Sequence, residues 1–153
     1  MKKIQDRKSL KKICTELRAE RKKIVFINGC FDILHAGHIK YLEKAKKLGD
    51  VLIVGLNSDK SVSIIKPGRP VNNEKNRATV LSALEMVDYI TIFSEDTPYD
   101  LIKVVRPDVL VKGGDWKKKD IVGSGIAIKT YSLPYLKGFS TTEIIEKILK
   151  GIK

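Results

Sequence analysis

The sequence is poor in cysteine and histidine. Cys14 and Cys30 are its only cysteines, and His35 and His38 are its only histidines. Two cysteines outside any metal-binding spacing are typical of free thiols in a reducing compartment, and they argue against a disulfide scaffold. The histidine pair leaves a zinc site open as an alternative, but a third ligand is hard to find.

Long apolar runs are also missing. No stretch is long enough to cross a bilayer, and the basic N-terminus lacks the apolar segment of a signal peptide. We therefore expect a cytoplasmic protein without a membrane partner. The 153 residues, 42% of them hydrophobic and 31% charged, are sufficient for one domain over residues 1–153 with a single buried core.

Acidic residues are too few to balance the basic ones. The chain has 30 Lys and Arg against 18 Asp and Glu, a formal net charge of +12. Residues 1–23 hold ten basic and three acidic side chains and are expected to form a basic helix packed on the domain. No aromatic residue precedes Phe26, so a solvated lysine-rich face is favoured there over a nucleic-acid site.

Strand and helix patterns alternate along most of the chain. The apolar runs predict strands at residues 24–28, 51–56, 89–93, 109–112 and 129–133, and helical periodicity predicts helices at 9–22, 37–48, 74–86, 99–105 and 141–149. Residues 57–73 are expected to form a polar loop, and residues 121–128 are ambiguous. Ser9 and Ser140 are candidate N-caps, the latter within a capping-box pattern. This order predicts an α/β fold: a Rossmann-like open parallel sheet of about five strands with helices on both faces.

The segment VFINGCFDILHAGH at residues 25–38 is the strongest functional motif. Its apolar run stops at Asn28 and Gly29, and His35 and His38 follow around Gly37 at the expected start of a helix. The first N–H groups of a helix lack partners and favour negative charge, so such a junction binds phosphate. Imidazoles can stabilise phosphoryl oxygens as charge develops on them. No serine or cysteine stands out as a nucleophile, which favours direct transfer between bound substrates.

Several loops are expected to meet at the same crevice. Asn28, Asn57, Phe93 and Lys112 end predicted strands, and ligands of open parallel sheets bind beyond the carboxyl ends of the strands, where the following loops lie. Basic residues lie in or near the loops that should surround the anion site: Lys66, Arg69, Arg77 and Lys112.

Two motifs resemble the signatures of the nucleotidyltransferase superfamily. HAGH at 35–38, after NGCFD at 28–32, resembles its HxGH signature, whose histidines contact triphosphate oxygens. STTEII at 140–145 resembles its second signature, a Ser/Thr pair that opens a helix and binds the β- and γ-phosphates. Several members carry an arginine after that pair. Ile144 and Ile145 stand there in this chain, so the resemblance leaves Arg77 or Lys66 for the basic contact.

A longer set of motifs resembles the heptose 1-phosphate adenylyltransferase domain over residues 9–150. The set includes NGCFDILHAGHIKYLEKAKKLGD, VGLNSD, RPVN, EDTPYDLI, RPDVLVKGGDW and KGFSTTEII. The resemblance implies transfer of AMP from ATP, with Mg²⁺, to a sugar 1-phosphate, giving ADP-heptose and pyrophosphate for lipopolysaccharide synthesis. It also implies a separate sugar kinase in the pathway and a homodimer. Residues 121–130 depart from the family because they are shorter than the usual helix and glycine turn.

The resemblance also assigns roles to individual residues. The expected catalytic residues are His35, His38, Lys66 and Lys112, and the expected sugar-phosphate contacts are Asp32, Asn57 and Arg69. The expected nucleotide and phosphate contacts are Asn28, Gly29, Cys30, Phe31, Gly37, Arg77, Gly113, Asp115, Ser140, Thr141 and Thr142. Mg²⁺ is expected to be held mostly by the nucleotide and water. Some of these residues have simpler alternatives: Asp32 and Gly29 as turn residues, Cys30 in packing, and Ser140 and Thr141 as helix caps.

Two other functions stay open. A glycerol-3-phosphate cytidylyltransferase that uses CTP has the same fold and the same histidine pair, but the KGGDW loop and the absence of an RTEGISTT-like ending argue against it. A basic RNA-binding or regulatory protein without activity is the second, and the presence of both HAGH and STT argues against it. Side-chain identity alone does not separate adenine from cytosine.

Overall fold

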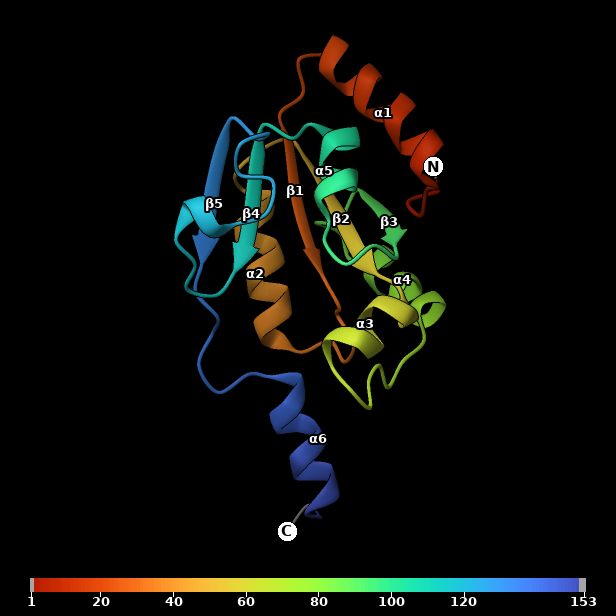
Figure 1. Cartoon of the computed structure of the whole chain (residues 1–153), viewed down its shortest axis with the longest axis vertical. Helices are drawn as coiled ribbons and strands as arrows, with labels where there is room; N and C mark the ends of the chain where they lie inside the picture. The colour runs from red at the N-terminus through yellow and green to blue at the C-terminus, as the bar shows by residue number, and fades with distance from the viewer. Residues whose placement is uncertain (1, 152–153) are drawn as a thin grey trace.

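Five parallel strands form one sheet in the computed structural model, which describes residues 2–151. The strands are β1 (Ile24–Gly29), β2 (Val51–Asn57), β3 (Tyr89–Phe93), β4 (Val109–Gly113) and β5 (Lys129–Leu133), in the order β3-β2-β1-β4-β5. The chain runs outward from β1 to β2 and β3 and then returns to the other side of β1 for β4 and β5 (Figure 1). This reversal places a crevice at the carboxyl ends of β1 and β4. The predicted Rossmann-like sheet is confirmed.

Helices cover both faces of the sheet. Helices α2 (Ala36–Lys46) and α4 (Glu74–Ser82) bury their apolar side chains in one core, and α1 (Arg7–Ala19) and α5 (Tyr99–Val105) do so in the other. The first core includes Leu42 and Leu81, and the second includes Leu10 and Leu101. The basic N-terminal helix α1 thus packs on the sheet. Helix α6 (Thr141–Leu149) extends away from the carboxyl edge of the sheet (Figure 1).

The structure corrects several predicted helix boundaries. Helix α1 begins at Arg7, and its N-cap is Asp6, whose carboxylate accepts the Ser9 N–H at 2.7 Å. Ser9 is therefore inside the helix and not its cap. Helix α2 ends at Lys46, before the predicted limit at residue 48, because residues 47–49 form a turn. Helix α4 ends at Ser82 instead of residue 86.

The expected polar loop at residues 57–73 contains a helix. Helix α3 spans Asp59–Ile65, and the Ser58 hydroxyl caps it by accepting the Ser61 N–H. Only Ser61 and Val62 are buried in this helix, so it gives almost no apolar periodicity in the sequence. The prediction of a loop was wrong for this reason.

The ambiguous segment at residues 121–128 forms turns. The connection from β4 to β5 has a short 3₁₀ helix, η1 (Lys118–Asp120), and no α-helix. Within residues 2–151, moreover, every helix is too short or too polar to span a membrane.

Candidate active site

The two histidines lie together where β1 leads into α2. His35 is the N-cap residue of α2 and has an extended backbone, while His38 lies in its first turn. Their imidazole rings stack with centroids 3.9 Å apart and planes 25° apart. The Phe31 ring lies 5.2 Å from that of His38. The motif therefore forms a compact pair of imidazoles at the positive end of a helix.

Gly37 is required by the packing of His35. A Cβ atom at position 37 would lie 2.9 Å from two atoms of the His35 ring and 3.0 Å from Cβ of Phe139. Any side chain there would displace the imidazole. The glycine between the histidines thus sets their geometry, and no direct ligand contact is needed to explain it.

Both imidazoles are neutral at physiological pH in this arrangement. Burial is the main cause that lowers the pKa of His38 to about 4, and the nearby His35 and Lys66 contribute to the same shift. Burial also lowers the pKa of His35, against the opposing charge of Glu143. The Nδ1 atoms of both rings are buried and have no hydrogen-bond partner among the described residues. Such unpaired polar atoms are suited to contact a bound ligand.

A cavity of about 400 Å³ opens at the carboxyl ends of the strands. The sequence predicted twelve of its lining residues: Asn28, Gly29, Cys30, Phe31, Asp32, His38, Asn57, Lys66, Arg69, Lys112, Gly113 and Thr141. Sequence reasoning did not assign eight others to the site: Tyr41, Ile65, Asp96, Thr97, Pro98, Trp116, Val122 and Tyr135. The predicted residues that do not line it are His35, Gly37, Arg77, Asp115, Ser140 and Thr142. The strand-end argument thus accounts for Asn28, Asn57 and Lys112, and the family resemblance supplied most of the other predicted residues.

Lys112 and Lys66 bring positive charge to this cavity. Lys112 is half-buried in β4, and burial lowers the pKa of its ammonium group. Its Nζ lies 5.9 Å from the centre of the Trp116 ring, and the Trp116 Nε1 donates to the carbonyl oxygen of Gly113 at 3.1 Å. Lys66 follows the last turn of α3. Both ammonium groups therefore come from elements that flank the histidines.

Asp32 anchors a loop. Its carboxylate accepts hydrogen bonds from Arg69 Nε and from the backbone N–H groups of Val71 and Asn72, at 2.5–3.0 Å. The Asp32 side chain is only 1% exposed. Burial acts to raise the pKa of Asp32, but these hydrogen bonds and the Arg69 charge outweigh it and lower the pKa. Because these donors occupy the carboxylate, the turn alternative fits Asp32 better than substrate binding.

Arg77 is buried and hydrogen-bonded to several segments of the protein. Its guanidinium is fully buried and donates to the carbonyl oxygens of Cys30 at 2.6 Å and Asn57 at 2.8 Å, and to Asp59 Oδ1 at 2.8 Å. Its Nε also donates to the carbonyl oxygen of Asn72. These bonds use four of its five donors on the protein itself, so one donor remains for the expected phosphate contact.

The backbone at Phe31 is strained next to Arg77. Phe31 has a positive φ of 45°, which is rare for a bulky residue and costs about 1–3 kcal/mol. Arg77 fixes the carbonyl before it, and the Asp32 hydrogen bonds fix the residue after it. The strained turn directs the Phe31 ring towards His38.

The N-terminus of α6 lies at the rim of the cavity. The Ser140 hydroxyl caps the helix by accepting the Glu143 N–H at 3.0 Å, as the capping-box pattern predicted. The Thr141 hydroxyl donates to the carbonyl oxygen of Ile33 at 3.2 Å, which joins α6 to the histidine loop. Thr142 and Asp115 are exposed outside the lining.

Comparison with known proteins agrees with this architecture. The family model described as cytidylyltransferase-like matches residues 26–147. The bifunctional protein HldE of Nitratiruptor is 56% identical over 146 residues, which are 95% of this chain and 32% of that protein. HldE of Campylobacter jejuni subsp. doylei is 58% identical over 142 residues, 92% of this chain and 31% of that protein. The chain thus spans about a third of the length of these relatives.

Solved structures are similar too. The lipopolysaccharide core biosynthesis protein of Thermoplasma volcanium is 32% identical, with a TM-score of 0.66, over 76% of this chain and 99% of that one. A pantoate-beta-alanine ligase of Francisella tularensis is 22% identical, with a TM-score of 0.63, over 97% of this chain and 78% of that one, and is similar in fold alone. The family model covers the sheet except the first two residues of β1, the histidine motif and most of α6. The chain therefore belongs to the cytidylyltransferase-like family.

Proposed function

We propose that this protein transfers AMP from ATP to heptose 1-phosphate, which yields ADP-heptose and pyrophosphate for surface-glycan synthesis such as that of lipopolysaccharide. The observation that carries the proposal is the stacked pair of histidines at a helix N-terminus, of which His38 lines a cavity together with Lys66 and Lys112. The high identity to HldE proteins supports the choice of substrate, as does the similarity to a lipopolysaccharide core biosynthesis protein.

The reaction needs positioning more than proton transfer. An oxygen of the sugar phosphate attacks the α-phosphorus of ATP, a new P–O bond forms, and the bond to the β-phosphate oxygen breaks. The attacking oxygen already carries negative charge, so a general base is unnecessary. Catalysis then consists of holding the phosphates in line and stabilising the charge of the transition state.

The histidines are assigned to the α-phosphate. Neutral imidazoles donate one hydrogen bond each, and the approach of a phosphate raises their affinity for a second proton. His38 lines the cavity and is assigned the direct contact, while His35 lies at the first N–H groups of α2. Together they place hydrogen bonds and partial positive charge where the phosphoryl oxygens gain charge.

The remaining predicted residues divide between the two substrates. Lys112, Gly113 and the N-terminus of α6, with Ser140, Thr141 and Thr142, are assigned to the nucleotide and the leaving pyrophosphate. Lys66, Arg69 and Asn57 are assigned to the sugar phosphate, because they lie on the β2 and α3 side of the cavity.

Asp96 is assigned to the hydroxyl groups of the sugar. It lines the cavity and makes no hydrogen bond or ion pair with another described residue, unlike the occupied Asp32. A free carboxylate repels phosphate but accepts hydrogen bonds from hydroxyls. A ligand that carries both a phosphate and hydroxyls would match the lysines and the free carboxylate of this cavity.

Mg²⁺ is proposed to enter with ATP. Within the described part of the chain, no group of three or more His, Cys, Asp or Glu side chains could hold a metal ion, so the triphosphate and water would supply most ligands. Asp96 is the cavity carboxylate that could add one ligand. When bound, the ion would neutralise charge on the phosphates.

The proposed reaction also implies an enzyme that supplies its substrate and a cellular compartment. A sugar kinase is the class of enzyme that makes a sugar 1-phosphate, and we propose that such an activity supplies the substrate. Since ATP is the proposed donor, we expect the reaction to run in the cytoplasm. A homodimer is part of the proposal by family resemblance, and sedimentation of the pure chain would test it.

Pyrophosphate release by the full chain with Mg²⁺ tests the proposal. Each of ATP, CTP, GTP and UTP is paired with heptose 1-phosphate and, separately, with glycerol 3-phosphate. Release with ATP and heptose 1-phosphate alone is expected. Release with CTP and glycerol 3-phosphate would replace it by a cytidylyltransferase function. If no pairing releases pyrophosphate and the chain binds RNA tightly, a nucleic-acid-binding protein without enzymatic activity is favoured.

A further inference from the structure

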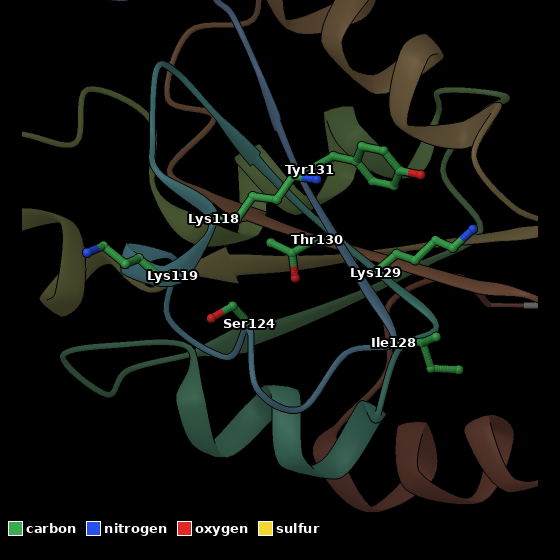
Figure 2. Close-up of a pocket in the computed structure, with 7 residues that line it drawn as sticks. All are labelled: Lys118, Lys119, Ser124, Ile128, Lys129, Thr130 and Tyr131. Atoms are coloured by element: carbon green, nitrogen blue, oxygen red, sulfur yellow. The ribbon is translucent and has the colours of Figure 1, made fainter.

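The connection between β4 and β5 leaves part of the sheet thinly covered. Parallel strands are usually joined by a crossover that contains an α-helix, which covers the sheet. Here residues 114–128 form turns and the short helix η1. A hollow of about 580 Å³ lies between η1 and β5, lined by Lys118, Lys119, Ser124, Ile128, Lys129, Thr130 and Tyr131 (Figure 2). None of these residues lines the candidate active site.

A buried hydroxyl without a partner lies in this hollow. Thr130 is 9% exposed, and its Oγ1 makes no hydrogen bond with any described residue. Figure 2 shows this hydroxyl near the centre of the lining, between Ser124 and Lys129. A buried hydroxyl that lacks a partner costs free energy, which a bound acceptor would recover. The geometry therefore indicates a ligand with hydrogen-bond acceptors.

The charge around the hydroxyl defines the ligand further. Lys118, Lys119 and Lys129 are exposed, and none of them forms an ion pair with another described residue. The Lys118 ammonium lies 5.5 Å from the centre of the Tyr131 ring. No acidic side chain lines the hollow, and the exposed Asp120 of η1 lies outside its lining. The three ammonium groups, with the hydroxyls of Ser124 and Thr130, favour an anion with several acceptor oxygens.

We propose that this hollow is a second anion site, which binds a phosphate group independently of the candidate active site. Thr130 and Ser124 donate hydrogen bonds to the phosphate oxygens, and the lysines close over it by rotating their exposed side chains. Free phosphate, pyrophosphate and a sugar phosphate carry the same recognised group. The site does not depend on the proposed reaction, because it shares no residue with that cavity.

Amide chemical shifts of the full ¹⁵N-labelled chain test this site. Inorganic phosphate, pyrophosphate and glucose 1-phosphate are titrated separately, against potassium chloride at matched ionic strength. We expect saturable shifts at Ser124, Lys129 and Thr130 that chloride does not reproduce. The ligand that saturates these shifts at the lowest concentration identifies the source of the phosphate. Absence of such shifts with all three ligands would overturn the proposal.

Variants then connect the shifts to the lining. Thr130→Val keeps the shape of the side chain but removes the hydroxyl, and it should weaken binding at least tenfold, whereas Thr130→Ser should restore it. Lys118→Gln with Lys129→Gln should abolish saturation. Lys75→Gln, an exposed lysine of α4, is the control for a lost charge and should bind like the wild type. If Thr130→Val and the double lysine variant both bind the phosphate ligand as tightly as the wild type, the site is refuted. Pyrophosphate release, measured on the same variants, reports the state of the active site separately.

Discussion

The Asp32 carboxylate and the Arg69 guanidinium form a buried ion pair, with Arg69 Nε 2.5 Å from Asp32 Oδ2. Both residues line the cavity, yet their charges are directed largely at one another. Two backbone N–H groups complete the contact, so the pair fixes the loop between α3 and α4 against the histidine motif. The loop that carries Arg69 is thereby held beside Lys66 before any substrate arrives.

Loss of the Asp32 charge should destabilise the protein. Asp32→Asn leaves the Arg69 charge buried without its partner, which costs on the order of 3–5 kcal/mol of unfolding free energy. Urea unfolding measures the loss. Glu95→Gln is the control, since the pair of Glu95 with Arg7 is exposed and contributes less than about 1 kcal/mol. If Asp32→Asn is as stable as this control but raises KM for the sugar phosphate, Asp32 is a substrate ligand after all.

Stability should fall in mild acid because of His38. An unfolded histidine has a pKa of about 6.5, whereas the folded pKa of His38 is about 4. Between these values the unfolded chain binds a proton that the folded chain does not, so the free energy of unfolding falls as pH drops from about 6.5 towards 4. His38→Gln should show a smaller loss between about pH 7 and pH 5 in denaturant titrations. An equal loss in both proteins would contradict the lowered pKa.

Replacement of His38 should also slow the proposed reaction. His38→Ala removes a donor to the α-phosphate, and the loss of such a donor reduces turnover by about 10²–10³-fold. Steady-state pyrophosphate release measures kcat and KM. Lys44→Ala, an exposed residue of the same helix, should retain wild-type turnover. Near-normal turnover by folded His38→Ala would remove the histidine from the mechanism.

The sequence predicted the sheet because its strands are apolar and almost fully buried. All residues of β2 are buried, so the run VLIVGL could only be a central strand. The missed helix α3 has two buried residues, and the correct cap of α1, Asp6, lies outside the apolar pattern used to find that helix. Helices that are stabilised mainly by capping and tertiary contacts show little hydrophobic periodicity in the sequence.

The site was predictable where function depends on strand ends. Asn28, Asn57 and Lys112 were found by that rule. The rule also placed the loop after Phe93 at the crevice, and Asp96 and Thr97 of that loop line the cavity. The roles of Asp32 and Arg77 could not be read from residue type. A carboxylate and a guanidinium near a phosphate motif suggest ligands, and only their hydrogen-bond partners show that the protein itself uses them.

Replacement of Arg77 should lower the stability of the protein more than it changes KM for ATP. Arg77→Met leaves the buried carbonyls of Cys30 and Asn57 without donors, and we expect a loss of about 3 kcal/mol or more. Arg77→Lys should recover only part of it, because one ammonium group cannot reach the same set of acceptors. Thermal unfolding measures the loss, and KM for ATP should stay within about twofold for the folded protein. A stable variant with a strongly raised KM for ATP would restore the phosphate contact.

Asp96 should discriminate the sugar from the nucleotide. Because its carboxylate lines the cavity free of described partners, Asp96→Ala removes an acceptor for sugar hydroxyls and should raise KM for heptose 1-phosphate about tenfold or more. KM for ATP should change little. KM of Asp96→Asn for heptose 1-phosphate should lie between those of the wild type and Asp96→Ala, because the amide oxygen still accepts hydrogen bonds. Asp100→Asn is the control, since its exposed carboxylate pairs with Lys103 away from the cavity. If Asp96→Ala instead raises KM for ATP in a manner that excess Mg²⁺ relieves, the carboxylate serves the metal–nucleotide complex, and the sugar must be recognised by the other cavity groups.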